Sequence, residues 1–135
     1  MWNVFTEHIH PGPIRRIALR YINRLELPLP FNDFKDYLRT APEVSADAPQ
    51  KLTEYFMRLV IPDDCSPSVA IVTEIMDPVT SSDQKNLHMT LDIDVFQLVP
   101  ETGDQRIWEI VSTLREYKDR IFFATITSKL KGLYE

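Results

Sequence analysis

Three arginines recur at a spacing of four residues and could bind an anionic group. Arg16, Arg20 and Arg24 lie in a segment where apolar and polar side chains alternate. This alternation is typical of a half-buried strand, so the three guanidinium groups are expected on one face. Guanidinium binds phosphate and carboxylate oxygens, so the row suits a phosphate ligand or an acidic partner. We favour the simpler interpretation, a solvated face, because antiparallel sheets commonly keep one face wet.

A second group combines an imidazole with two carboxylates. His88, Asp92 and Asp94 alternate with apolar residues in the clearest strand pattern of the chain. Same-face neighbours on a strand lie about 6.6–7 Å apart, whereas one metal ion needs bonds of about 2 Å. We therefore predict no metal. Instead, Asp92 and Asp94 are expected to neutralise the arginine row if the two strands are neighbours.

Asn23 is a polar residue on the apolar face of the arginine-bearing strand. A buried amide needs hydrogen bonds, so Asn23 either bonds a buried backbone group or lines a small pocket near Arg20 or Arg24. We favour the backbone bond. With these residues, the candidate ligand or partner face consists of Arg16, Arg20, Asn23, Arg24, His88, Asp92 and Asp94.

The elements that must position these side chains are four strands and two helical regions. Alternation predicts strands over residues 14–27, 55–61 and 87–95, and a segment rich in Val, Ile and Thr predicts a further strand over 68–76. The helical regions are a short helix over 32–39, with Asn32 as its N-cap, and a longer one beginning at Asp104. Thr125 and Thr127 weaken the second pattern, which leaves open one kinked helix or two packed ones.

The order β-α-β-β-β-α predicts an α+β fold, in which helices cover one face of a four-stranded, mostly antiparallel sheet. A chain of 135 residues with 44% hydrophobic content is expected to form one domain, over 1–135. The uncovered face is expected to be charged and to carry Arg16, Arg20, Arg24, Arg58, Glu74, His88, Asp92 and Asp94.

Composition narrows the functional classes. The net charge of −5 is opposite to the usual footprint of a nucleic-acid binder. A single cysteine favours a reducing compartment, and we expect a cytoplasmic protein without a membrane segment. The chain contains no Gly-rich phosphate loop, nucleophile elbow, Cys-x-x-Cys pair or H-E-x-x-H helix, so we expect no cofactor and favour a protein that is not an enzyme.

The run Arg16-Ile-Ala-Leu-Arg-Tyr-Ile-Asn-Arg-Leu25 resembles the R-I-G-L-R-Y-I-N-R-I signature of a sporadically distributed bacterial family of uncharacterised proteins. Ala18 replaces the family glycine and Leu25 the last isoleucine, and residues 114–127 are similar to the family's closing helical segment. Members are usually about twice as long, so the resemblance implies that this chain is the C-terminal half of a longer architecture. It implies no reaction.

The leading hypothesis is a non-catalytic interaction domain that forms a homodimer or docks on a partner domain. Its motivation is the apolar C-terminal helix and the terminal aromatic residues Trp2 and Phe5. One alternative is nucleic-acid or phosphate binding through the arginine row. Another is an enzyme with an unfamiliar site around Arg20, His88, Asp92 and Asp94.

Overall fold

The computed structural model describes residues 1–9, 12–81, 83–99 and 104–135. No helix in these ranges is both long and apolar enough to cross a membrane. In chain order the elements are α1 (Trp2–Ile9), β1 (Arg16–Pro28), the 3-10 helix η1 (Phe34–Asp36), β2 (Tyr55–Pro62), β3 (Ser68–Met76), β4 (Asn86–Leu98), α2 (Asp104–Thr125) and α3 (Ser128–Lys131).

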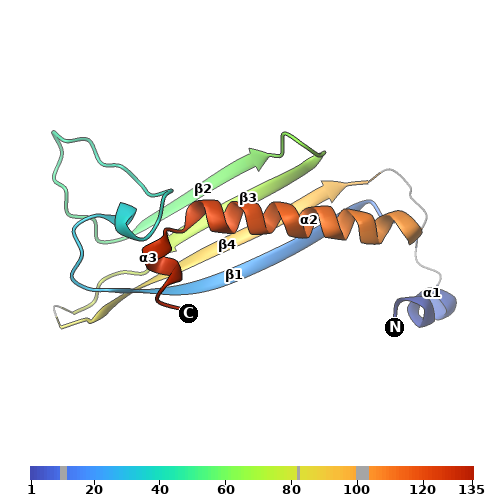
Figure 1. Ribbon diagram of the computed structural model, residues 1–135, viewed down its shortest axis with the longest axis horizontal. Helices are drawn as coiled ribbons and strands as arrows, with labels where there is room; N and C mark the ends of the chain where they lie inside the picture. Colours follow the sequence, from blue (N-terminus) through green and yellow to red (C-terminus); the bar gives the residue numbers. More distant parts are fainter. Residues whose placement is uncertain (10–11, 82, 100–103) are drawn as a thin grey trace.

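The four strands form one sheet in the order β1-β4-β3-β2, and every neighbouring pair is antiparallel. Helix α2 lies along one face of this sheet, while α1 lies apart at the end where β1 begins (Figure 1). The predicted α+β class and the four-stranded antiparallel sheet are confirmed. All four predicted strands are present, with ends that differ by at most a few residues.

The first helical region is shorter than the sequence pattern predicts. The helix expected over 32–39 is the three-residue η1, and its N-cap is Asp33, whose carboxylate accepts a hydrogen bond from the Lys35 backbone N–H at 2.8 Å. The prediction of Asn32 as the cap is therefore wrong by one residue. Helix α1 was not expected. Trp2, Phe5 and Ile9 do recur at helical spacing, but the helix has only eight residues and the residue before it, Met1, is not one that caps helices.

The C-terminal region contains two helices and not one kinked helix. Between α2 and α3, Ile126 forms an isolated antiparallel bridge with Leu38, next to η1. Thr127 then caps α3, because its hydroxyl accepts a hydrogen bond from the Leu130 backbone N–H. The capping residue expected for the first of these helices, Asp104, is the first residue of α2, and its side chain lies outside the described part of the structure.

The core lies between the sheet and α2. Central strand β4 directs every second side chain from Leu87 to Val95 into it, and all five are almost fully buried. Helix α2 is tied to the far edge strand as well, because the Tyr117 hydroxyl donates a hydrogen bond to the Ile61 carbonyl at 2.7 Å. Arg120 of α2 also pairs with the nearly buried carboxylate of Asp63, just after β2. A hydrogen bond from the Ser66 hydroxyl is the main cause that lowers the pKa of Asp63.

The one-sided core leads to a stability prediction. Ile93 of β4 is 0% exposed, whereas Ile22 of β1 is 60% exposed. Truncating Ile93 leaves a cavity, so Ile93→Ala should lower the free energy of unfolding by about 2–5 kcal/mol. The control Ile22→Ala should lower it by less than about 1 kcal/mol. Urea unfolding of both variants checks this, and equal losses would contradict a core confined to one face.

Candidate partner-binding face

The face of the sheet opposite α2 is here called the open face. It is built from alternate residues of all four strands, which the register places in rows across the sheet. Its members are Arg16, Ala18, Arg20, Ile22, Arg24 and Glu26 of β1, His88, Thr90, Asp92, Asp94 and Phe96 of β4, Val69, Ile71, Thr73 and Ile75 of β3, and Phe56, Arg58 and Val60 of β2.

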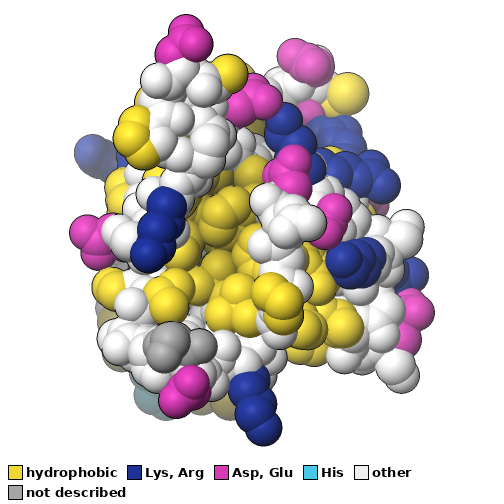
Figure 2. Space-filling view, turned by 90° about the vertical axis from the view of Figure 1, so that its left-hand side faces the viewer, with side chains coloured by type: hydrophobic (Ala, Val, Ile, Leu, Met, Phe, Trp, Pro, Cys, Tyr) yellow, Lys and Arg dark blue, Asp and Glu magenta, His cyan; other side chains and the backbone are white. Residues whose placement is uncertain are grey.

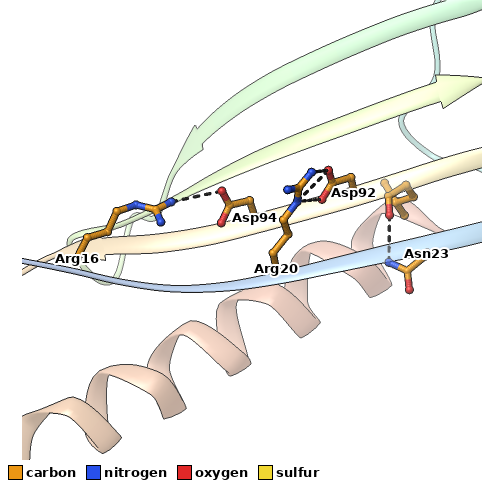
Figure 3. Close-up of polar contacts among 6 residues, drawn as sticks. Arg16, Arg20, Asn23, Asp92 and Asp94 are labelled. Atoms are coloured by element: carbon orange, nitrogen blue, oxygen red, sulfur yellow. Dashed lines mark hydrogen bonds and ion pairs between the residues drawn. The ribbon is translucent and has the colours of Figure 1, made fainter. Parts of the chain in front are cut away.

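Two ion pairs neutralise two of the three arginines in the row (Figure 3). Arg20 binds Asp92 through two nitrogens, with Nε 3.0 Å from Oδ1 and Nη2 2.6 Å from Oδ2. This hydrogen-bonded pairing raises the pKa of Arg20. Arg16 Nη2 lies 3.3 Å from Asp94 Oδ2. Strands β1 and β4 are neighbours, so the expected cross-strand neutralisation is confirmed.

Asn23 satisfies its amide as expected, because Nδ2 donates a hydrogen bond to the Leu91 carbonyl of β4 at 3.2 Å (Figure 3). It also lines a recess of about 440 Å³ with Arg24 and Phe122. Both alternatives left open by the sequence therefore apply. Unlike the residues of the open face, Asn23 belongs to the side of the sheet that carries the core.

His88 does not join the two aspartates. Its Nδ1 lies 3.9 Å from Oε1 of Glu26, the residue directly opposite His88 on the neighbouring strand β1. In the described part of the chain, no three His, Cys, Asp or Glu side chains gather closely enough to hold a metal ion. Of the seven candidate residues, the structure thus brings Arg16, Arg20, Asp92 and Asp94 together, and places His88 and Arg24 further along the same face.

The open face also has an apolar half that the sequence analysis missed. On edge strand β2, Phe56 is 66% exposed and Val60 is 55% exposed, and half-buried Ile71 and Ile75 lie beside them on β3. A signal was present, because residues 55–61 are apolar at most odd and even positions alike. Strands that are apolar on both sides are typical of sheets covered on both faces.

A hollow lined by both apolar and polar side chains lies at one end of the sheet. Its volume is about 430 Å³, and its lining includes Phe31, Phe34, Leu52, Met76 and Val79. Seen from this end, hydrophobic side chains gather in a central recess with charged side chains around it (Figure 2). Two of the charged side chains in its lining pair with each other, since Lys35 Nζ lies 2.6 Å from Glu43 Oε1. The Asp33 carboxylate, which also lines the hollow, accepts a hydrogen bond from the Lys35 backbone N–H.

Glu74 was expected on the charged face, and that prediction is wrong. It points to the helix-covered side of β3 and is 1% exposed. The prediction failed because β3 has apolar or small residues at both odd and even positions, so the alternation pattern could not show which side of this strand faces the core. Only Tyr55 reaches the carboxylate, donating a hydrogen bond to Oε2 at 3.3 Å, and Oε1 has no partner in the described residues.

Burial makes Glu74 the most strongly perturbed acid described. Loss of solvent raises its pKa to about 7, and the Tyr55 hydrogen bond opposes that rise only partly. A carboxyl with such a pKa could exchange protons near neutral pH. It does not line the end hollow, however, and Tyr55 is its one hydrogen-bond partner in the described part of the chain, so a substrate has no evident place beside it.

Comparisons with known proteins do not assign a role to either surface. The chain matches no protein-family model, no curated protein and no solved structure.

Glu74 generates a pH prediction. The folded chain holds this proton more tightly than the unfolded chain, so the stabilisation is complete below about pH 4.5 and is lost as pH rises to about 7 and above. Between pH 5 and 8, the free energy of unfolding of the wild type should therefore fall by roughly 2–4 kcal/mol more than that of Glu74→Gln. Urea unfolding across this range measures the difference.

A second variant refines this test. Tyr55→Phe removes the hydrogen bond that lowers the pKa of Glu74, so the loss of stability should extend to higher pH than in the wild type. If the free energies of unfolding of the wild type and of Glu74→Gln differ by the same amount from pH 5 to 8, Glu74 is not a buried group that titrates in this range.

Proposed function

We propose that this chain is a non-catalytic interaction domain that binds another protein surface through the open face. The observation that carries the proposal is that two strands of the sheet have two apolar faces, while the rest of the described chain covers only one of them. Strands β2 and β3 are apolar on both sides, whereas α2 and the core cover one side. Exposed apolar groups that lie together in this way are typical of surfaces that a partner covers.

The size of the open face supports the same proposal. Four strands about 4.8 Å apart cover roughly 19 by 24 Å, because even the shortest strand, β2, has eight residues and so seven steps of about 3.4 Å. That flat area of roughly 450 Å² is more than half of the ~800 Å² that each partner buries in a standard interface, before side-chain relief is counted. Covering Phe56, Val60 and Ile22 would remove their exposed apolar surface from water.

The alternatives have less support. For nucleic-acid or phosphate binding, two of the three arginines in the row are already neutralised by aspartates. The Phe96 ring, which could stack on a base, is already in contact with the Arg16 guanidinium, 4.5 Å from its centroid. That leaves Phe56 as an exposed aromatic platform on this face. For catalysis, neither the open face nor Glu74 offers a nucleophile paired with a base.

The occupant we propose is a second copy of the chain or a partner domain, such as the N-terminal half that the sequence resemblance implies. We place this association in the bacterial cytoplasm. The single cysteine, Cys65, is exposed and free, which suits a reducing compartment.

Site-specific crosslinking tests the proposal. A photoreactive benzoyl-phenylalanine in place of Phe56, an exposed side chain of the apolar half, should give a discrete crosslinked protein in cells of the source organism. The same group in place of Trp108, equally exposed but on α2, should not. The product at position 56 should disappear when Val60→Lys is added, because Val60 lies four residues further along β2 on the same face.

Either of two results would contradict the proposal. One is an absence of crosslinking from position 56 in a folded chain. The other is an equal yield from both positions that Val60→Lys leaves unchanged, since that pattern indicates random encounters.

A further inference from the structure

Two arginines of the open face have no acidic partner. Among the described residues, neither Arg24 of β1 nor Arg58 of β2 has a carboxylate within ion-pair distance, and both are exposed. Arg16 and Arg20, by contrast, bind Asp94 and Asp92. The open face therefore offers two free cations, one on each edge strand, and the register places between them Thr90, Ile75, Thr73 and Asp92, whose carboxylate is already paired with Arg20.

The register sets the spacing of these cations. Arg24 is level with Phe56 across the sheet, and Arg58 lies two residues further along β2. Three strand spacings and one two-residue step separate their Cα atoms by roughly 16 Å. A helix rises about 1.5 Å per residue, so about eleven residues cover this distance, and residues eleven apart return to nearly the same face of the helix.

Charge argues against a second copy as the occupant. The open face carries four arginines against the three carboxylates of Glu26, Asp92 and Asp94, although the whole chain has a net charge of −5. A two-fold dimer would press this face against an identical one. Arg24 and Arg58 would then lose water against a surface with the same excess of arginine, and a desolvated charge without a partner is strongly unfavourable.

We infer that the occupant of the open face is an amphipathic helix of a partner protein, and that this helix carries two carboxylates about eleven residues apart. This inference rests on the proposed function. The carboxylates pair with Arg24 and Arg58, and the apolar stripe between them covers Ile75 and Phe56. Helix α1 of this chain cannot fill that place, because it has eight residues and one carboxylate, Glu7.

A charge-swap experiment tests the inference with three synthetic helices of about 20 residues that share one leucine stripe. The acidic helix has glutamates eleven residues apart on the stripe face, the basic helix has lysines there, and the third has the glutamates six residues apart. Fluorescence anisotropy measures their binding to the full chain at low salt. The acidic helix should bind on the order of ten-fold more tightly than either of the others.

The protein variants complete the test. Arg24→Glu with Arg58→Glu should reverse the preference, so that the basic helix binds more tightly. The control Arg106→Glu with Arg115→Glu makes the same change in net charge on α2 and should leave the preference unchanged.

The outcomes separate the inference from the proposed function. If all three helices bind equally and Phe56→Ser abolishes binding, the interaction domain stands and the acidic helix is wrong. A dimer in light scattering that Phe56→Ser dissociates would replace the acidic helix with a second copy. If no helix binds, the inference is overturned, and crosslinking from position 56 decides the proposed function separately.

Discussion

The alternation of side chains along central strand β4 is the constraint on which the rest of the structure depends. Its odd residues from Leu87 to Val95 are buried beneath α2, so the even residues must lie on the opposite face. Because β4 pairs with both β1 and β3, its register also determines which side chains of those strands face the core. A shift of one residue would bury Asp92 and Asp94 and expose the core, so the pairing is strongly specified.

This constraint produces an open face with two different halves. On the β1 and β4 side, Arg16 and Arg20 meet their aspartates and form a nearly neutral polar surface. On the β2 and β3 side, the same face is apolar and exposed. The two free arginines lie at opposite edges of this surface, so apolar burial and charge recognition can act on one partner together.

The sequence predicted the sheet well because β1 and β4 alternate between apolar and polar residues. It also predicted that Asp92 and Asp94 would neutralise the arginine row and that Asn23 would bond a backbone group, although the strand order was needed to identify that group as the Leu91 carbonyl. It placed Glu74 on the wrong face, because β3 lacks a contrast between its two sides. The break between α2 and α3 depends on the bridge between Leu38 and Ile126, a contact between distant segments that helical periodicity cannot reveal.

The most direct test of this account is hydroxyl-radical footprinting of the purified chain at a concentration where it is monomeric. Phe56 should be oxidised as readily as Phe123, which is exposed on α2, whereas the buried rings of Tyr37 and Tyr117 should stay protected. Protection of Phe56 to the level of Tyr117 would contradict the account, because the chain would then cover the open face by itself.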